Sequence, residues 1–375
     1  MIRLDRRPEP SQVWSWATPI LAVVATMIAG GLMFLILGKD PFLAIRTIFW
    51  DPIFGEFASY SRPQLLIKAG PLILIATGLA MGFRAGIWNI GAEGQYIVGA
   101  ICAAAVPLIF YPGETVTLFG REMALAIESR LVIFPLMILA GLAGGILWAL
   151  IPAILKVRFG TNEILVSLML VYVAENLLAY MALGPMRNPE GMGFPGSRNL
   201  SQYEPSANLE LIANTGMHWG VVAALIAVIL GYVVLSRHIL GFNIRLAGQS
   251  PRAAAFSGVN PARLIILCMA IAGGLAGLAG MFEISGPSGR VSIDFNVGYG
   301  FTAIIVAFLG RLHPVGILLA GLLLALTYIG GELAQLTLGL PVAAIQLFQG
   351  MLLFFLLALD VLTNYRVRIG RKEVA

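Results

Sequence analysis

The sequence contains few charged residues. Asp, Glu, Lys and Arg together make up 11% of the 375 residues, whereas 59% are hydrophobic and the mean hydropathy is +0.89. Soluble domains carry about 25% charged residues, and a surface with so few charges would expose apolar patches larger than a soluble monomer tolerates. This shortage excludes water as the main solvent of the chain and indicates that much of its surface faces lipid.

Cysteine, histidine and enzymatic motifs are also scarce. The two cysteines, Cys102 and Cys268, each lie in an apolar run, so no disulfide framework is indicated. The histidines His218, His238 and His313 are scattered, and the sequence has neither a Gly-x-x-x-x-Gly-Lys-Ser/Thr phosphate loop nor a His-Glu-x-x-His motif. We therefore expect no metal, no cofactor and no enzymatic activity in this chain.

What the sequence has in abundance is long apolar runs. A membrane span needs about 20 mostly apolar residues, and this rule predicts an all-α polytopic membrane protein with about ten transmembrane helices in one domain, 1–375. The predicted spans are 16–38, 65–83, 88–111, 131–155, 162–183, 218–236, 264–285, 297–310, 314–330 and 342–361, of which the eighth and ninth are short. The first run is longer than a typical signal-peptide core and lacks a cleavage pattern, so we interpret it as a retained span.

The basic residues predict the topology. The net charge of +5 arises from short Lys and Arg clusters between the spans, which fits membrane orientation better than a nucleic-acid patch. An even number of spans puts both termini on one side, and both are basic, so we expect both in the cytoplasm. The terminal clusters are Arg3, Arg6 and Arg7 at one end and Arg366, Arg368, Arg371 and Lys372 at the other.

The order of the spans also allows an internal repeat. Spans two to five and seven to ten form two sets of four that are five crossings apart, so the second set would run through the membrane upside down relative to the first. This is the geometry of an inverted repeat. The hypothesis rests on counting spans, because the halves have no convincing similarity at the level of residues.

A first functional candidate is the stretch 82–95, where glycines and polar residues interrupt an apolar run. Charged side chains at membrane depth cost at least about 2.5 kcal/mol and normally face protein or a water-filled cavity, and irregular backbone is tolerated there only when it is covered. Asn89, Glu93 and Gln95 are therefore candidate residues of a translocation pathway. The alternative is a cytoplasmic turn anchored by Arg84.

A second candidate is the longest inner loop, about 237–263. Ser250 before Pro251 is a fitting N-cap followed by proline at the first helical position, and Gly258 is a fitting stop, so we expect a short helix parallel to the membrane. Such a helix suits docking onto a cytoplasmic partner. The alternative is a helix that only rests on lipid headgroups.

A third candidate follows the seventh span, whose glycines at 273, 274, 277 and 280 predict close helix packing. Glu283 and Arg290 come next, and they could pair with each other or shape the mouth of a pathway. Lys68 and Glu175 are candidates for a proton relay, although snorkelling or helix packing explains single residues of this kind more simply.

Several of these segments resemble the permease subunits of bacterial nucleoside and simple-sugar ABC importers, which are related to ribose and branched-chain amino acid permeases. The resemblance extends from about Leu65 to Asp360 and is most specific for the longer of the two nucleoside permeases. It is carried by Phe83-Arg84-Ala85-Gly86, Asn89 to Gln95, Glu283 with Gly286, Gly289 and Arg290, Gly298-Tyr299-Gly300-Phe301, Leu309 to Pro314, and Gln346 to Gly350.

This resemblance implies a function and a set of partners. It implies that the chain forms, with a second permease, the path of an importer in the bacterial cytoplasmic membrane, with two ATPase subunits below and a solute-binding protein above. The segment from Gly248 to Asn260 would be the ATPase coupling segment, although relatives usually carry Asn where this chain has Ser250. Its candidate residues are Gly248, Pro251, Arg252, Ala253, Ala254 and Gly258.

Three alternatives remain open from the sequence. The cargo of an importer could be ribose, another simple sugar or a branched-chain amino acid instead of a nucleoside. A secondary transporter driven by an ion gradient would need no ATPase, and a scaffold subunit would not transport. The outer loop, about 184–217, matches the family least and could be specific to the binding protein of this chain.

Overall fold

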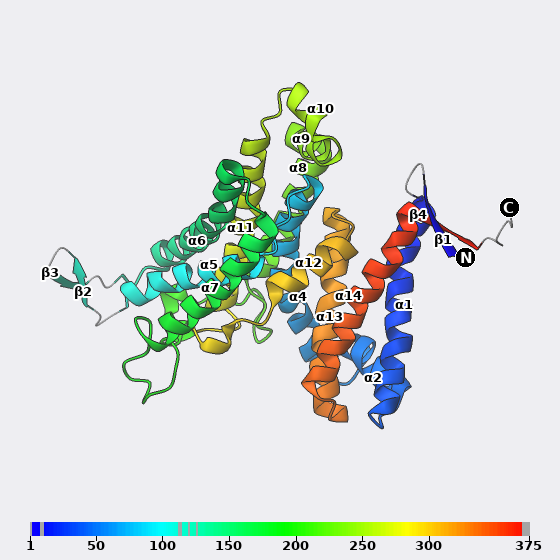
Figure 1. Ribbon diagram of the computed structural model, residues 1–375. Helices are drawn as coiled ribbons and strands as arrows, with labels where there is room; N and C mark the ends of the chain where they lie inside the picture. Colours follow the sequence, from blue (N-terminus) through cyan, green and yellow to red (C-terminus); the bar gives the residue numbers. More distant parts are fainter. Residues whose placement is uncertain (1, 8–10, 112–114, 119–120, 125–126, 370–375) are drawn as a thin grey trace. The chain divides into compact units, whose positions relative to one another are not determined.

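The computed structural model describes residues 2–7, 11–111, 115–118, 121–124 and 127–369 (Figure 1). About 76% of the chain is helical. The described strands form two short antiparallel pairs, β1 (Ile2–Arg6) with β4 (Tyr365–Ile369) and β2 (Thr115–Leu118) with β3 (Arg121–Ala124). These pairs lie outside the long helices, so the helical class predicted from the apolar runs is confirmed.

Among the described residues, nine helices are long and apolar enough to cross a membrane. They are α1 (Gln12–Ile36), α4 (Ala58–Arg84), α5 (Ala92–Ile109), α6 (Arg130–Phe159), α7 (Glu163–Leu183), α8 (Trp219–Arg237), α11 (Pro261–Ser285), α13 (Pro314–Leu338) and α14 (Val342–Asn364). Each coincides with one of the predicted spans, and the ninth prediction, 314–330, belongs to a helix of 25 residues. The chain is a multi-pass membrane protein.

The eighth predicted span is not a full crossing. Helix α12 (Tyr299–Leu309) has 11 residues, which corresponds to about 16 Å against the roughly 30 Å of a hydrocarbon core. The preceding segment 286–298 is irregular except for the 3₁₀ turn η3 (Ile293–Phe295), and Gly298 at its end has a φ of +81°. The sequence is apolar enough for a span here, but the helix begins too late to cross the membrane alone.

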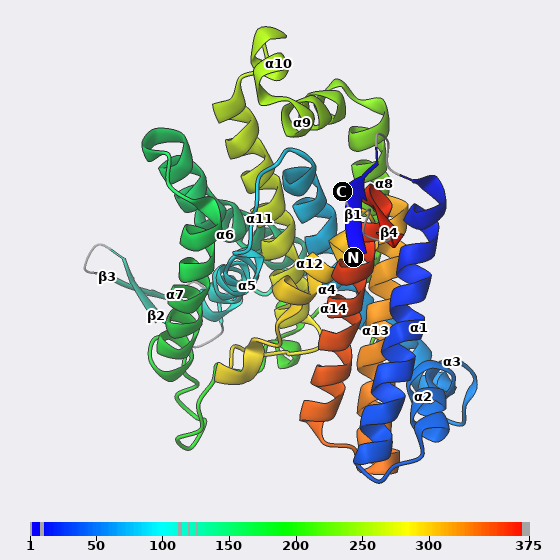
Figure 2. The same cartoon turned by 45° about the vertical axis from the view of Figure 1, so that its right-hand side comes forward.

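The chain divides into two compact units, Met1–Arg62 with Ala325–Ala375 and Pro63–Leu324. In the second unit, α5, α6 and α11 pack against one another (Figure 2). Gly277 of α11 faces Gly141 and Gly145 of α6, and a Cβ atom on Gly277 would overlap the carbonyl oxygen of Gly141. The glycines of the seventh predicted span therefore allow the close backbone contact expected of them.

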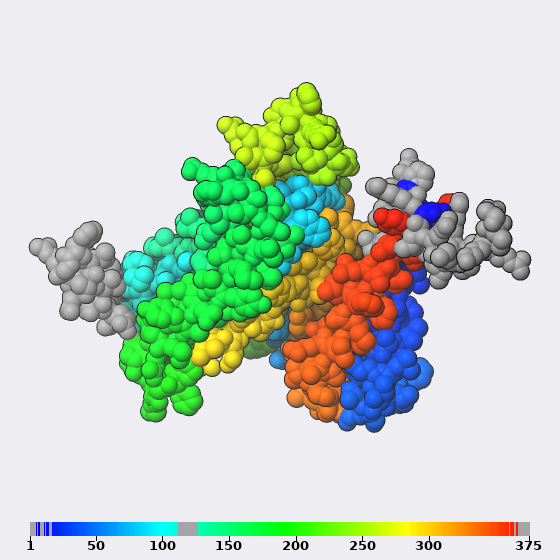
Figure 3. Space-filling view, viewed as in Figure 1, coloured from blue at the N-terminus to red at the C-terminus, as the bar shows by residue number. Residues whose placement is uncertain are grey.

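Two other features of the second unit concern its surface and its ends. Helix α7 covers much of the face turned to the viewer in Figure 3. The apolar side chains that this helix exposes include Leu165, Met169, Tyr172, Val173 and Tyr180. Helices α9 (Ile239–Gln249) and α10 (Pro251–Phe256) lie at one end of the unit, and the segment 184–217 lies at the opposite end (Figure 1). That segment contains two 3₁₀ turns, η1 (Leu200–Gln202) and η2 (Glu204–Ser206).

In the first unit, α1 and α14 lie side by side, with Phe34 and Phe348 stacked at a centroid distance of 5.8 Å. Ile48 completes a buried cluster with them. The pairing of β1 with β4 brings the two described ends of the chain together in this unit. Their cytoplasmic side and the single domain 1–375 stay predictions, and Arg371 and Lys372 lie outside the described residues.

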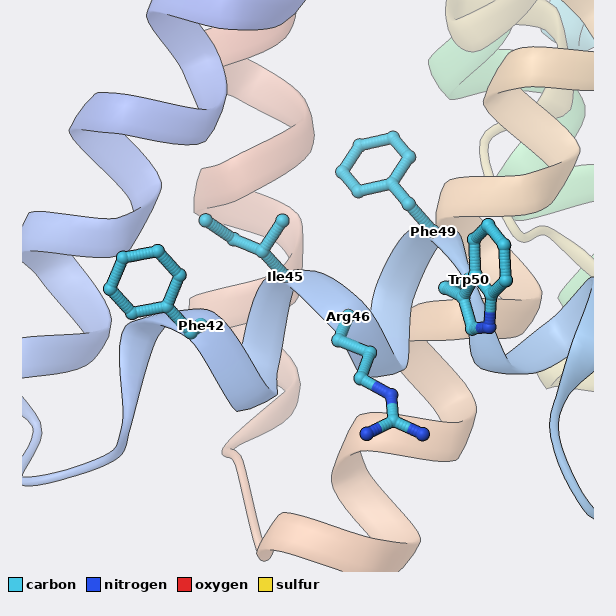
Figure 4. Close-up of a pocket in the computed structure, with 5 residues that line it drawn as sticks. All are labelled: Phe42, Ile45, Arg46, Phe49 and Trp50. Atoms are coloured by element: carbon cyan, nitrogen blue, oxygen red, sulfur yellow. The ribbon is translucent and has the colours of Figure 1, made fainter.

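A short helical elbow follows α1. It consists of α2 (Pro41–Phe49) and α3 (Asp51–Phe54), and its aromatic side chains border a shallow cavity of about 390 Å³ (Figure 4). Phe42 and Trp50 are largely exposed, and Arg46 forms an ion pair with Asp51 at 3.3 Å. Exposed aromatic rings with one cation are typical of the interface between membrane and water, so this elbow fits a membrane anchor better than a cargo site.

Candidate functional site

The stretch 82–95 forms a break between two helices. Helix α4 ends at Arg84, residues 85–91 are not helical, and α5 begins at Ala92. Gly86 has a φ of +75°, which a residue with a side chain rarely adopts. The helix break expected from these glycines is therefore confirmed, and the polar residues of the stretch lie at the start of α5.

Asn89 and Gln95 satisfy each other inside the protein. The Asn89 Nδ2 donates to Gln95 Oε1 at 2.9 Å, and the Gln95 Nε2 donates to Asn89 Oδ1 at 3.0 Å. Asn89 Oδ1 also accepts from the backbone N–H of Gly91 at 3.0 Å. Both side chains are buried. This amide pair fixes the turn that leads into α5, because each partner occupies the other's donor and acceptor.

Glu93 joins α5 to the start of the short helix α12. Its Oε1 accepts from the backbone N–H of Gly298 at 3.1 Å, and its Oε2 accepts from the N–H of Gly300. The first N–H groups of a helix have no partner within the helix and carry partial positive charge, so a carboxylate is a fitting cap. Gly300 lies so close that a Cβ atom on it would overlap the backbone of Glu93.

The two outer candidates, Glu283 and Arg290, differ in burial. Glu283 is buried near the end of α11, whereas Arg290 is exposed in the segment 286–298. Within the described residues no ion pair joins the two, and the cation that interacts electrostatically with Glu283 is Lys68. The Lys68 Nζ also lies 5.7 Å from the centroid of the Tyr299 ring. Of the two possibilities that the sequence leaves open for Glu283 and Arg290, the described residues show no mutual ion pair, and a role at the mouth of a pathway stays a prediction.

Glu175 also takes part in this region. Its Oε1 accepts a hydrogen bond from Asn296 Nδ2 at 2.7 Å, which fixes the segment before α12 to α7. This contact gives Glu175 a packing role of the kind that the sequence favoured over a proton relay.

The inner loop 237–263 is mostly helical. The short helix expected after Ser250 is α10, with Ser250 Oγ accepting from the Ala253 N–H at 3.4 Å and Pro251 in the first turn. Gly258 follows it with a φ of +81°. Helix α9 was not foreseen from the sequence. Arg252, Ala253 and Phe256 are exposed on α10, whereas Ala254 is buried.

The coupling candidate Gly248 makes a close contact that the sequence did not reveal. It lies at the end of α9, and a Cβ atom there would overlap the carbonyl oxygen of Arg84 at the end of α4. Gly86 is also adjacent, with 3.9 Å between its ideal Cβ position and the Cα of Gly248. The inner loop therefore touches the backbone that leads into the helix break and, through it, the start of α5.

A polar cluster at the start of α8 was also missed. His218 Nδ1 accepts from the Gly220 N–H at 3.1 Å, and Asn208 Nδ2 lies 3.3 Å from the same nitrogen. Burial lowers the pKa of His218 to about 4, so the ring is neutral at pH 7. The only sequence signal was that His218 stands directly before an apolar run, where the N-cap of a helix is expected. This signal does not reveal which residues the histidine contacts.

These features define the class of the protein as a polytopic membrane protein with a helix break between α4 and α5 and a short helix, α12, that does not cross the membrane alone. The chain belongs to the family described as the permease component of branched-chain amino acid transport systems, which matches residues 62–357. This family is the membrane component of ABC transporters and is not itself catalytic. No solved structure gives a significant match.

Curated relatives cover nearly the whole chain. It is 32% identical to the glucose ABC transporter permease protein TsgB13 of Haloferax volcanii, over 98% of this chain and 94% of that protein. It is 29% identical to the guanosine ABC transporter permease protein NupP of Bacillus subtilis, over 93% of this chain and 94% of that protein. The nucleoside ABC transporter permease protein NupB of Lactococcus lactis is 28% identical over 90% of this chain and 89% of its own length.

Proposed function

We propose that this chain forms half of the translocation path of an ATP-driven importer for nucleosides or related purine and sugar solutes. The observation that carries the proposal is the family match together with relatives named for guanosine, nucleosides and glucose. A second permease, two ATPase subunits and an extracytoplasmic solute-binding protein complete the importer. The chain resides in the cytoplasmic membrane with both termini inside.

The proposed mechanism is alternating access driven from the inner loop. ATP-dependent closure of the ATPases moves α9 and α10, and the tight contact of Gly248 with Arg84 passes this displacement to residues 85–91. That segment leads into α5, whose Glu93 is bonded to the start of α12. A shift of the inner loop thereby tilts the two helices whose beginnings are joined by Glu93.

In this mechanism the pathway residues act in two ways. Asn89, Glu93 and Gln95 are buried, so they do not line the pathway themselves. They support its wall by holding the beginnings of α5 and α12 in place. Glu283 and Arg290, near the end of α11, are second-rank candidates for its mouth.

The cargo is tested by competition. In proteoliposomes that contain the complete importer, ATP-dependent uptake of labelled guanosine should be inhibited by excess unlabelled nucleosides. Inhibition by glucose and not by nucleosides would replace the nucleoside assignment by the sugar alternative, which the relative from Haloferax volcanii favours. Inhibition by leucine would favour the cargo in the family's description.

The driving force is tested in the same vesicles. Uptake should require ATP and the ATPase subunits, and an imposed proton or sodium gradient should not replace them. Uptake by the purified chain alone under an ion gradient would overturn the importer proposal in favour of a secondary transporter.

The coupling segment is tested by charge at its exposed surface. Ala254 is buried and Gly258 has a positive φ, so substitutions there would disturb the loop itself. Phe256 is 96% exposed, so Phe256→Glu should prevent co-purification of the ATPases while the chain remains inserted in the membrane. Phe194→Glu changes another Phe, 76% exposed in the segment 184–217, and should leave the ATPases bound. Equal ATPase recovery from both variants would contradict the assignment of α10 as the docking helix.

A further inference from the structure

A cavity of about 360 Å³ lies where the beginnings of α4 and α8 meet the end of α11. The predicted topology puts this end outside the cell, at the end opposite to α9 and α10. Small-molecule sites have volumes from about 300 Å³ upward. Ile67, Ala207 and Pro287 provide apolar surface, and the polar residues that line the cavity are Gln64, Ser201, Asn208, Glu210, His218 and Ser285.

His218 lines this cavity, and one of its ring nitrogens lacks a hydrogen-bond partner among the described residues. Its Nδ1 accepts from the Gly220 N–H, and the ring is neutral, so the proton of the imidazole is on Nε2. The side chain is 2% exposed, and Nε2 finds no acceptor among the described residues. A buried donor without an acceptor is energetically unfavourable. The imidazole N–H beside the cavity therefore has no acceptor among the described residues.

The neighbouring polar side chains differ in how many hydrogen bonds they already form within the protein. Asn208 is engaged, because its Nδ2 also donates to Ser285 Oγ at 3.3 Å and its Oδ1 accepts from the Trp219 N–H at 3.3 Å. In the described part of the chain, the half-buried amide of Gln64 makes no hydrogen bond. The cavity thus combines the engaged polar groups of Asn208 and Ser285 with the free amide of Gln64.

The charge of the lining restricts what can enter. Glu210 is the one charged residue among the described residues that line the cavity, and it is exposed at the cavity's edge. An anionic solute would meet this carboxylate without a compensating cation, which disfavours it. A neutral solute with hydroxyl and ring-nitrogen groups and one apolar face matches both the hydrogen-bonding groups and the apolar wall.

We propose that this cavity is an entry subsite for the cargo, which accepts a neutral, hydroxyl-bearing solute such as a nucleoside or monosaccharide and rejects its phosphorylated form. The inference rests on the proposed import function. It adds to that function a selection by charge within the permease itself, before the solute reaches the junction of α5 and α12.

The test uses the complete importer in proteoliposomes with labelled guanosine and labelled glucose as probes. Gln64→Leu keeps the side-chain size but removes the free amide, and it should raise the KM for the transported probe roughly tenfold, the equivalent of about 1.4 kcal/mol for one lost hydrogen bond. Glu210→Arg replaces the anion at the edge by a cation. In this variant, guanosine monophosphate or glucose 6-phosphate should inhibit uptake of the probe. Glu204→Arg makes the same charge change at an exposed residue outside the cavity and should leave the wild-type selectivity unchanged.

The outcomes separate the two proposals. If the wild-type importer takes up neither probe with ATP, the proposed function fails. If the wild type transports but Gln64→Leu keeps its KM and Glu210→Arg still ignores the phosphorylated compounds, the import function stands and the subsite is refuted. Because Glu210 is exposed, its substitution remains informative even if the Gln64 variant does not fold.

Discussion

The hydrogen bonds between Glu93 and the start of α12 allow us to predict how much stability a substitution at Glu93 costs. Glu93→Gln preserves the shape of the side chain, but one of the two oxygens that accept from Gly298 and Gly300 becomes an NH₂ donor. One of these two bonds is then lost, although the Gly298 N–H also donates to Asn296 Oδ1 at 3.2 Å. A buried donor left unsatisfied costs about 1–3 kcal/mol, and hydrogen bonds to charged groups are worth about 1.5–3 kcal/mol. We therefore expect a loss of about 2 kcal/mol in the free energy of unfolding.

The chain offers a matched control for this change. Glu175 accepts one hydrogen bond, from Asn296 Nδ2 at 2.7 Å, and the carbonyl oxygen of a Gln can still accept it. Glu175→Gln should therefore cost less than about 1 kcal/mol, the usual net value of a neutral hydrogen bond. The measurement is equilibrium unfolding of the purified chain in mixed micelles, together with ATP-dependent uptake by the reconstituted importer.

The comparison of the two variants decides the argument. Uptake should fall more in Glu93→Gln than in Glu175→Gln, because the beginnings of α5 and α12 are no longer held together. If both variants lose the same free energy, the Glu93 carboxylate does not cap α12 as an ionised group, and the role assigned to this junction is refuted.

Two further predictions concern the inner contact and the buried histidine. Gly248→Ala places a Cβ against the carbonyl oxygen of Arg84 and should cost about 1–3 kcal/mol of stability and reduce ATP-dependent uptake. Gly350→Ala adds a Cβ that meets no atom within 4 Å, so this variant should keep its stability and its uptake. Equal losses in both variants would contradict the contact between Gly248 and Arg84. Burial lowers the pKa of His218 to about 4, against about 6.5 when unfolded. Its neutral ring therefore stabilises the fold fully above pH 6.5, and this contribution is lost as the pH falls from 6.5 to 4. His218→Asn should reduce the acid destabilisation measured between pH 7 and pH 5 by about 2 kcal/mol, and an unchanged pH dependence would contradict this.

The sequence alone determined the membrane class, the family and most of the helices. Lipid admits only long apolar helices whose backbone is satisfied internally, so apolar runs of sufficient length predict spans directly. The Ser250-Pro251 start of α10 and the glycine break at 82–95 followed from local backbone preferences, which act within a few residues. Each of these features depends on residues that are close together in the chain, so the sequence alone predicts them.

Only the tertiary structure decided which distant residues meet. Glu93 and Gly300 are separated by more than 200 positions in the chain, and Gly248 contacts Arg84 from another helix. Such contacts depend on how the helices pack, which neither composition nor periodicity specifies. The sequence did not reveal that α12 is too short to cross the membrane, for a related reason. Its sequence is apolar enough to span, but the Glu93 carboxylate caps it at Gly298 and Gly300 and so fixes where the helix begins.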